Sequence, residues 1–367
     1  MDDQQQLLDI AESYLREAVA PHATEIDSDA DALRDALIGL GDRSLLSLRV
    51  PKAWGGAEVS EKTDRTYQEM VARYSGALAF LQTQHQGATG MLAQSENDTL
   101  KQKYLPHIHS RVLFGVGFSQ LRHQGVPPVK AIPVEEGYQL DGQVPWVTGW
   151  SFFQAFIVGA VLPDGRSVFG VLPFKNTSQN GEGEITFSEP MPLAAMASTN
   201  TVTAHLNRWF LNNKDVVFVK PAGWIHENDK KNVLLHGFFA LGCARAGLDI
   251  VESASQTKQL PFITEAFKDL NQELTACRTV MIQQQPQTMT VAEKLQLRAW
   301  AIDLAVRCAH AAVTVSSGVA NSSYHAAQRV YREALAFTVF GQTTAVMEAT
   351  LARLVRSKSN ELYFDER

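Results

Sequence analysis

The sequence predicts an α+β protein in which two groups of helices flank a central group of strands. Apolar residues follow helix-type spacing up to about residue 111 and again from about residue 222. Between these limits the chain changes to short β-branched and aromatic runs that are separated by turn signals. We therefore expect an N-terminal helical domain over residues 1–111, a middle β domain over residues 112–221 and a C-terminal four-helix bundle over residues 222–367.

The N-terminal domain contains a series of segments with one apolar face each. We predict helices at residues 4–20, 29–41, 63–74, 77–94 and 101–109. His85 interrupts the apolar face of one of these helices. A single histidine in that setting is more often a hydrogen-bonded core residue than a ligand, so we interpret His85 as structural.

The middle domain contains short runs that are typical of strands. We predict strands at residues 112–119, 154–162, 167–173, 184–187, 201–206 and 216–219. Turns are expected at Glu136-Gly137, Asp141-Gly142 and Asp164-Gly165, because these dipeptides favour tight hairpins. The polar segment 176–183 is predicted to be an exposed loop.

Long helices return in the C-terminal domain. They are predicted at residues 228–258, 261–282 and 291–319, and two further periodic runs follow. The last two runs are separated by the polar loop 340–344, which contains a glycine, a glutamine and two threonines. Backbone and hydroxyl groups of such a loop can point at a ligand.

Composition excludes several classes of protein. With 367 residues, 45% hydrophobic residues and a net charge of −6, the chain can bury a large core and is not expected to bind nucleic acid. Its apolar runs are too short for a membrane span, and the acidic start is unlike a signal peptide. The three cysteines are widely spaced, so no Cys-x-x-Cys metal or redox motif exists, and we predict a cytoplasmic protein without a metal site.

The tripeptide Arg332-Glu333-Ala334 and the loop that begins at Phe340 resemble two linked motifs of the acyl-CoA dehydrogenases. In that family, an Arg-Asp-Ala helix leads into an aromatic-Glu-Gly-Thr loop beside a flavin. The order of helices, strands and helices resembles the same family over essentially the whole chain. The resemblance implies a flavin-dependent oxidoreductase that acts on CH–CH groups, with FAD as cofactor. The family's catalytic glutamate falls on Gly341, however.

The β domain contains two motifs that resemble flavin contacts of this family. Residues 141–149 resemble the strand whose tryptophan covers the isoalloxazine ring and whose threonine hydrogen-bonds its polar edge. The resemblance assigns these functions to Trp146 and Thr148. A planar indole and a hydroxyl suit a planar heterocycle. Phe118 and Ser119 fall on the second flavin-contacting segment, where the resemblance implies that Ser119 supplies a hydroxyl.

The C-terminal domain keeps some cofactor positions of the family. Lys258 falls on an arginine that reaches the FAD pyrophosphate of a neighbouring subunit, and it keeps the charge without the bidentate fork. Gly318 falls on one of two glycines on the adenosine side, and Thr343 on the threonine of the flavin loop. The cofactor-binding set implied by the resemblance is therefore Phe118, Ser119, Trp146, Thr148, Lys258, Gly318 and Thr343.

Other positions depart from the family. The Gly-rich phosphate loop is replaced by residues 121–128, in which two consecutive prolines remove backbone donors. The alternative position of the glutamate, on the first helix of the C-terminal domain, falls on Asn232. Glu333 and Glu348 are the nearest carboxylates in sequence, and Glu333 matches a structural aspartate. The sequence thus assigns no catalytic residue.

Two functions remain open after this comparison. In the first, the protein is an acyl-CoA dehydrogenase-like flavin-dependent oxidoreductase with an altered active site, or a related monooxygenase, acting on a small molecule such as an acyl thioester. In the second, it is a non-catalytic member of the fold that acts as a binding or scaffold protein. Because the family's cofactor site is completed across a subunit boundary, we also expect a homodimer or homotetramer that associates through the C-terminal bundle.

Overall fold

The computed structural model describes residues 3–108, 112–180, 183–283 and 288–356, and it divides into two compact units. The first unit comprises residues 1–67 and 74–228, and the second comprises residues 68–73 and 229–367. Helices, a sheet and further helices follow one another along the chain, which confirms the predicted α+β class. The predicted boundary at residue 111 lies outside the described residues, and the division into three domains stays a prediction.

The N-terminal helices begin at polar caps. Asp29 accepts hydrogen bonds from two backbone amides at the start of one helix, Ser75 accepts one at the start of another, and Asn97 accepts one at a third. The helices of this segment are α1 (Asp3–Tyr14), α2 (Ala23–Ser28), α3 (Ala30–Gly41), α4 (Glu61–Tyr74), α5 (Gly76–Ala93) and α6 (Asp98–Tyr104).

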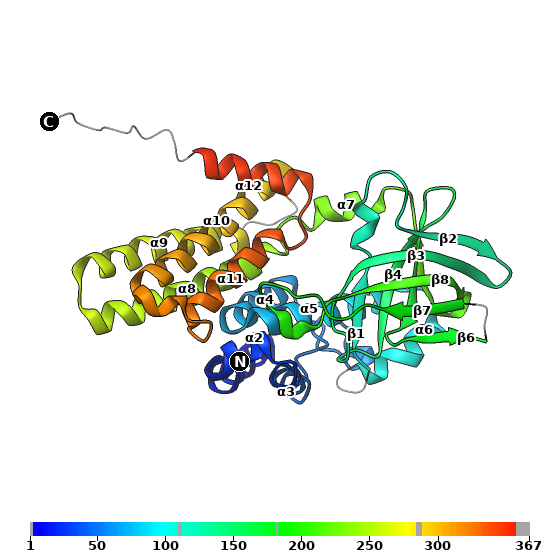
Figure 1. Ribbon diagram of the computed structural model, residues 1–367, viewed down its shortest axis with the longest axis horizontal. Coiled ribbons are helices and arrows are strands. Elements are labelled where there is room, and N and C mark those ends of the chain that lie inside the picture. The colour runs from blue at the N-terminus through cyan, green and yellow to red at the C-terminus, as the bar shows by residue number, and fades with distance from the viewer. Residues whose placement is uncertain (1–2, 109–111, 181–182, 284–287, 357–367) are drawn as a thin grey trace. The chain divides into compact units, whose positions relative to one another are not determined.

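The sheet of the first unit is mostly antiparallel (Figure 1). Its strand order is β6-β7-β8-β3-β2-β4-β5-β9, and β1 pairs with β4 in parallel. The strands are β1 (Phe114–Gly117), β2 (Val129–Val134), β3 (Gly137–Val147), β4 (Ala155–Val161), β5 (Ser167–Pro173), β6 (Thr177–Gln179), β7 (Gly183–Phe187), β8 (Val202–Asn212) and β9 (Val216–Lys220).

Two turn predictions are confirmed and one is wrong. Glu136-Gly137 joins β2 to β3, and Asp164-Gly165 joins β4 to β5. Asp141-Gly142 instead lies inside β3, where the pairing with β8 shifts register. Gly142 has φ +129°, and a Cβ atom there would lie 2.0 Å from the Pro128 carbonyl oxygen. Asp141-Gly142 therefore lies at a β-bulge and not in a turn. Glycine is required at residue 142 because the Pro128 backbone lies too close for a side chain.

The strand predictions omitted β2, β3 and β6, although the family resemblance had marked residues 141–149 as a strand. Strand β6 lies within the segment that was predicted to be a loop. Strands β2 and β6 are short, most of β2 is exposed, no residue of β6 is buried, and β2 contains Pro133. Exposed strands of this kind lack the alternating apolar face that reveals a strand in a sequence.

His85 joins α5 to the sheet. Its Nε2 donates to the Ile108 carbonyl at 2.9 Å, and its Nδ1 accepts the Phe114 amide at 3.0 Å. The side chain is fully buried. Because these two backbone groups hold both ring nitrogens in the neutral form, His85 is a structural core residue.

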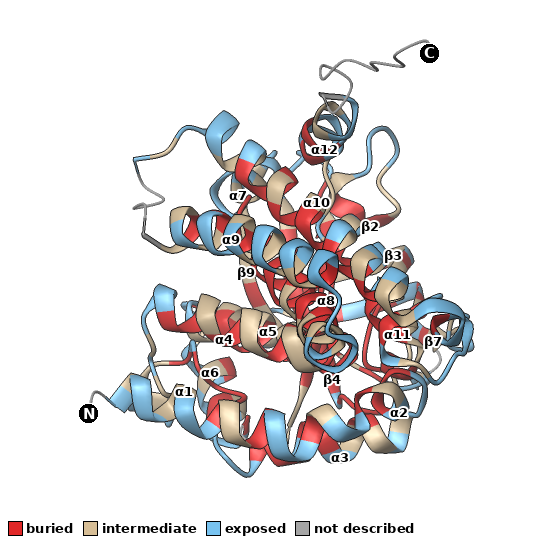
Figure 2. Ribbon diagram, turned by 90° about the vertical axis from the view of Figure 1, so that its left-hand side faces the viewer, coloured by how far each residue is buried: buried red, intermediate tan, exposed pale blue. Residues whose placement is uncertain are grey.

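The second unit is a bundle of α8, α9, α10 and α11, with α12 packed against α10 (Figure 1). Buried residues surround much of α8, whereas α9 keeps an exposed face (Figure 2). A helix that is buried on most sides is the centre of such a bundle. The helices are α8 (Gly237–Lys258), α9 (Pro261–Gln283), α10 (Val291–Ser316), α11 (Ala326–Val339) and α12 (Thr344–Arg356).

The helix predicted over residues 228–258 is interrupted. Helix α7 (Trp224–Lys231) ends before a turn at residues 232–236, and α8 starts after it. Asn232 therefore lies in a turn and not on a helix. Helix-type spacing continues across this break, because the buried Val233 and Leu234 of the turn keep the apolar pattern.

The middle of α4 belongs to the second unit. Glu69 accepts from the Arg278 Nε at 2.7 Å, and the Arg73 Nε donates to Asp249 at 2.7 Å. At Gly242 of α8, a Cβ atom would lie 2.1 Å from the Glu69 carbonyl oxygen. Close helix packing at a glycine, together with two ion pairs, fixes residues 68–73 against α8 and α9.

The cysteines are structural. Cys243, Cys277 and Cys308 are buried and make no disulfide. Burial raises the pKa of the Cys277 and Cys308 thiols to about 12 and that of Cys243 well above its usual value. Thiols that stay protonated are poor nucleophiles and poor metal ligands. Within the described residues, no helix is both long and apolar enough to cross a membrane.

We predict that Gly142→Ala destabilises the first unit far more than Gly125→Ala. The first substitution places a methyl group against the Pro128 carbonyl, whereas a Cβ atom at Gly125 meets nothing within 4 Å. Both glycines have positive φ, so each substitution costs about 1–2 kcal/mol in backbone strain. Gly142→Ala should cost a further ~2 kcal/mol through overpacking, measured by urea unfolding. Equal losses in the two variants would contradict the close contact.

Candidate functional site

The residues implied by the family resemblance are distributed over both units. Phe118, Ser119, Trp146 and Thr148 belong to the first unit, and the others belong to the second. The surroundings of each side chain decide whether it can face a ligand.

Trp146 presents a large aromatic surface near the end of β3. The side chain is 52% exposed, whereas its neighbour Val147 and the nearby Val144 are fully buried. Alternation along the strand therefore directs the indole away from the core. An indole with half its surface open can stack on a planar ring.

Thr148 is less open than the sequence analysis implied. Only 4% of it is exposed, and its hydroxyl shares a hydrogen bond of 2.9 Å with the hydroxyl of Thr201. Gly149, directly after it, has φ +99° and donates its amide to the Thr199 carbonyl. The segment after β3 is thus fixed against the segment that precedes β8.

Phe118 and Ser119 have different environments. The Phe118 ring packs edge-on against Phe169 at 5.6 Å between centroids, so its side chain belongs to the core. Ser119 is exposed at the start of a short 3₁₀ helix. Gln120 anchors this turn by donating to the Gly117 and Gly159 carbonyls at 3.0 and 2.8 Å. The Ser119 hydroxyl is therefore held at the surface by a buried neighbour.

In the second unit, Lys258 and Gly318 lie near the C-terminal end of α10. The Lys258 ammonium donates to the Val315 carbonyl at 2.5 Å, which places a cation on the last turn of α10. Gly318 is exposed, and a Cβ atom there would meet nothing within 4 Å. Lys258 therefore caps the end of α10. The surface at Gly318 is open and could be approached by a ligand.

Thr343 is the N-cap of α12. Its hydroxyl oxygen accepts the Val346 amide at 3.3 Å, and its carbonyl accepts the Met347 amide at 2.9 Å. The hydroxyl proton is not used in the first of these bonds, since the oxygen is the acceptor. Thr343 can therefore both start the helix and donate to a ligand.

Gly341 does not leave an empty space at the position of the family's base. Its φ is +51°, and a Cβ atom built on it would lie 2.5 Å from Cε1 and 2.6 Å from Nδ1 of His236. The imidazole of His236, which the sequence analysis did not single out, thus occupies the volume into which a side chain at residue 341 would begin. A glutamate cannot be added here without displacing that ring.

Arg298 of α10 contacts both His236 and the residue before Gly341. It is 2% exposed, donates through Nη1 to the Val233 carbonyl at 3.0 Å, and donates through Nη2 to the Phe340 carbonyl. Its Nη1 also faces Nδ1 of His236 at 3.5 Å. One buried cation therefore joins the turn before α8 to the loop between α11 and α12.

The candidate carboxylates have other surroundings. Glu333 is fully buried and accepts from the Arg329 Nη1 at 2.7 Å within α11. This pairing agrees with its interpretation as a structural residue, since removing a carboxylate from a buried ion pair is costly. Glu348 is exposed on α12, and Asn232 is exposed in the turn before α8.

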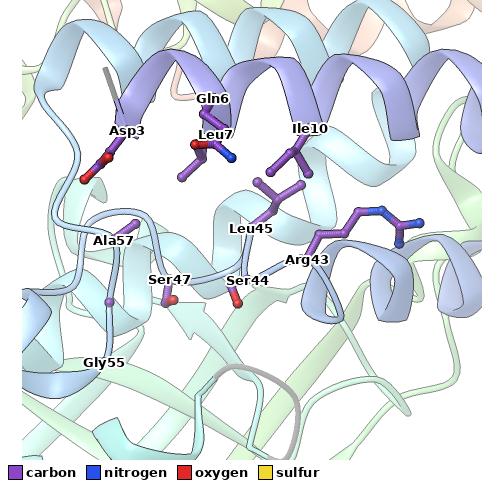
Figure 3. Close-up of a pocket in the computed structure, with 11 residues that line it drawn as sticks. Asp3, Gln6, Leu7, Ile10, Arg43, Ser44, Leu45, Ser47, Gly55 and Ala57 are labelled. Atoms are coloured by element: carbon purple, nitrogen blue, oxygen red, sulfur yellow. The ribbon is translucent and has the colours of Figure 1, made fainter. Parts of the chain in front are cut away.

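A small pocket of about 220 Å³ lies elsewhere, between α1 and the segment that follows α3 (Figure 3). Leu7 and Ile10 of α1 face Leu45 across it, and Asp3 and Arg43 are among its charged residues. It contains none of the residues implied by the family resemblance. We interpret it as an imperfectly filled groove between two helical segments.

Comparison with known proteins shows which proteins this chain is similar to. Residues 1–111 match the family model described as acyl-CoA dehydrogenase, N-terminal domain. A 3-(aryl)acrylate reductase of Clostridium sporogenes is 23% identical over 363 residues, which covers 94% of this chain and 96% of that protein. The chain is thus similar to acyl-CoA dehydrogenases in the sequence of its N-terminal segment and in its fold.

Other similar proteins are one further relative by sequence and two solved structures that share the fold. The mitochondrial isovaleryl-CoA dehydrogenase of Bos taurus is 28% identical over 154 residues, 40% of this chain and 36% of that protein. The solved butyryl-CoA dehydrogenase from Megasphaera elsdenii has a TM-score of 0.78 at 16% identity, covering 97% of this chain and 99% of that one. Glutaryl-CoA dehydrogenase from Mycobacterium smegmatis has a TM-score of 0.80 at 14% identity, with coverage of 97% and 95%.

The sequence analysis of this acyl-CoA dehydrogenase homologue missed His236, Arg298 and Thr201. His236 was hidden inside an apparently continuous helix, and Arg298 looked like an ordinary charge on a long helix. A signal for Arg298 was its place between the apolar residues Leu297 and Ala299. Thr201 is distant from Thr148 in sequence, and only strand pairing brings them together.

We predict that Gly341→Glu destabilises the second unit by about 2–4 kcal/mol, through positive φ and contact with the His236 ring. Removing the ring with His236→Ala should lower the cost of Gly341→Glu by at least ~1 kcal/mol in a double-mutant cycle. Urea unfolding of the four proteins measures this coupling. The exposed His310 supplies the control: His310→Ala combined with Gly341→Glu should be additive. Additivity with His236→Ala as well would contradict the contact.

Proposed function

We propose that this protein is a flavin-dependent oxidoreductase that binds FAD and acts on the carbon–carbon bond next to a carbonyl or carboxyl group, without the family's glutamate base. The reductase from Clostridium sporogenes, to which it is similar over nearly its whole length, is named for 3-arylacrylates. We therefore propose an α,β-unsaturated acid, or its thioester, as the small-molecule substrate. When bound, FAD would supply or accept the hydride.

The exposed indole of Trp146 is the main observation that supports FAD binding. Large aromatic side chains are usually buried, and more than half of this one is open. Burying that surface against a planar isoalloxazine would be favourable. The exposed Ser119 hydroxyl and the helix-capping Thr343 are further candidate donors, whereas Thr148 is engaged with Thr201 and Phe118 contributes only its backbone. Phosphate contacts are proposed for Lys258 and Gly318.

The proposal that the reaction differs from the family's dehydrogenation is supported by the surroundings of Gly341. Removal of an α-proton from an acyl thioester needs a base in contact with the substrate, and Gly341 has no side chain to provide one. His236 occupies the adjoining volume. Dehydrogenation of saturated acyl-CoA is therefore not expected. Reduction of an enoate would take hydride from the reduced flavin at the β-carbon and a proton from solvent at the α-carbon, so it needs no carboxylate base at residue 341. A related monooxygenase reaction is the alternative within the same class.

A non-catalytic function is the second candidate. It is favoured by the filled space at Gly341 and by Lys258, whose ammonium caps α10. In that case the fold would act as a binding or scaffold protein, and no flavin would be held.

We further propose a cytoplasmic homodimer or homotetramer. Buried thiols without disulfides support a reducing compartment. The small apolar residues of α10 are covered by their own unit, with Ala305, Ala309 and Ala312 buried, so they are not part of the proposed interface. Exposed apolar stripes lie instead on α11, at Tyr331, Leu335 and Val339, and on α12, at Met347, Leu351, Leu354 and Val355.

The cofactor proposal predicts a visible spectrum. Purified protein with FAD should be yellow, and Trp146→Ala should weaken FAD binding by about tenfold, or ~1.4 kcal/mol, through loss of stacking. Phe210→Ala, at another exposed aromatic residue of the sheet, should change the dissociation constant of FAD by less than about twofold.

The substrate proposal is tested on the same FAD-loaded protein. After reduction by dithionite, cinnamate added without oxygen should reoxidise the flavin, and butyryl-CoA should not bleach the oxidised flavin. A colourless protein that ignores added FAD would favour the non-catalytic function, and bleaching by butyryl-CoA would show that a base is present.

The oligomer proposal predicts that charge on the apolar stripes separates the subunits. The double variant Leu335→Asp, Leu351→Asp should shift the mass measured by light scattering at micromolar concentration to that of one chain. Burying carboxylates in an apolar interface is strongly unfavourable. The control is Ile38→Asp, at an exposed apolar residue of α3. A monomeric mass for the unaltered protein would refute the oligomer, and an unchanged mass for the double variant would exclude these stripes from the interface.

A further inference from the structure

We propose that Thr203 of β8 is a positioning residue for Trp146: its hydroxyl holds a β-bulge in β3, and the bulge directs the indole out of the core. The inference deepens the proposed function and rests on it for the flavin that would stack on the indole. Thr203 does not itself contact the cofactor. It acts through the backbone of the residue that precedes Trp146.

The pairing of β3 with β8 contains one extra residue next to Trp146. Three steps along β3 correspond to two steps along β8 between two paired positions, which are Val144 with Ala204 and Val147 with Val202. Pro145 and Trp146 therefore lie opposite the single residue Thr203. Two residues opposite one form a β-bulge, a feature that turns side chains to a new face of a sheet.

The bulge decides the direction of the indole. In a regular strand, residues two apart share a face, so Trp146 would point to the same side as Val144. Val144 is fully buried, and so is Val147, although these two residues are three positions apart. The extra residue thus moves Trp146 to the outer face, where it is 52% exposed, and returns Val147 to the core.

Pro145 explains why a side chain is needed at the bulge. A proline has no amide N–H to donate to a neighbouring strand, so within sheets it occurs mainly at edges and bulges. Its carbonyl oxygen remains an acceptor. The Thr203 hydroxyl donates to this carbonyl at 3.1 Å. One side-chain hydrogen bond therefore joins β8 to the residue of β3 directly before Trp146.

The backbone of Thr203 bonds to a different segment. Its amide donates to Ser188 Oγ at 3.0 Å, and its carbonyl accepts the Ser188 amide at 2.9 Å. Ser188 directly follows β7, so both backbone groups bond to that side of β8. The hydroxyl is therefore the group of Thr203 that reaches Pro145. A β-branched side chain suits this function, because its χ1 angle is restricted.

A second side-chain bond holds the chain on the other side of the indole. The Thr148 and Thr201 hydroxyls share their bond of 2.9 Å two residues after Trp146. The backbone is thus fixed to β8, or to the residue before it, both ahead of the indole and behind it. Fixing these residues in advance lowers the entropy that is lost when a planar ligand stacks on Trp146.

The positioning is tested first without any cofactor, by ¹⁹F NMR of protein labelled with 5-fluorotryptophan. The Trp146 signal is the one that is absent from Trp146→Phe. It should be single in the unaltered protein and in Thr203→Ser, which keeps the hydroxyl. In Thr203→Val, which has the same shape but no donor, the signal should broaden or split because the bulge is no longer held. An unchanged Trp146 signal in Thr203→Val would overturn the proposal.

The control for this measurement is Thr186→Val in β7. Thr186 pairs with His205 of β8 and not with a residue of β3, so its variant should leave the Trp146 signal unchanged. If Thr203→Val does not fold, Thr203→Ala is measured in the same way and with the same expectation. An equal change in the Thr186 and Thr203 variants would show a general effect on the sheet and would contradict the specific bond.

The consequence for the cofactor is tested by titration with FAD. Thr203→Val should weaken FAD binding by about three- to tenfold, and Thr203→Ser should stay within about twofold of the unaltered protein. Where Trp146 is already replaced by alanine, adding Thr203→Val should change the dissociation constant by less than about twofold, because Thr203 acts through the indole. A purely structural function would weaken binding equally with and without the indole.

The two proposals fail in different ways. A protein that binds no FAD overturns the proposed function, whereas the ¹⁹F measurement still decides whether Thr203 positions Trp146. A protein that binds FAD, but in which Thr203→Val has the same effect with and without the indole, overturns only the assignment of Thr203. Failure of Thr203→Ser to restore the single Trp146 signal would also overturn it, because the hydroxyl would then not be the group that acts.

Discussion

The local geometry around Gly341 depends on one buried charge. Arg298 places its guanidinium between the turn that precedes α8 and the loop that joins α11 to α12, and it donates to a backbone carbonyl in each. Burying a cation is unfavourable unless its donors are satisfied. The two segments are therefore held where their carbonyls meet the guanidinium, and the His236 ring is held with them.

This constraint explains how a chain similar to the acyl-CoA dehydrogenases can have glycine at the position of that family's glutamate without leaving a cavity. Gly341 has a left-handed backbone conformation that favours glycine, and the imidazole of His236 fills the adjacent volume. The loss of the carboxylate and the presence of the ring are thus parts of one packing arrangement.

The structure also separates residues that the family resemblance grouped together. Trp146 and Ser119 are open to a ligand, whereas Phe118 packs in the core and Thr148 shares its hydroxyl with Thr201. Lys258 caps a helix, a function that any cation near the last turn of α10 would serve. The family motifs therefore identified these residues, but they did not predict which atoms of each residue can still contact a ligand.

The sequence by itself determined the α+β class, most of the helices and the strands with a clear apolar pattern, because burial of one face leaves a period in the sequence. It also determined that Gly341 cannot be the base, since a glycine has no side chain. Only the tertiary structure decided what replaces that side chain. His236, Arg298 and Gly341 are far apart in sequence, and their contact arises from helix packing that leaves no local pattern. The same reason hid the break before α8, where buried residues keep helical spacing through a turn.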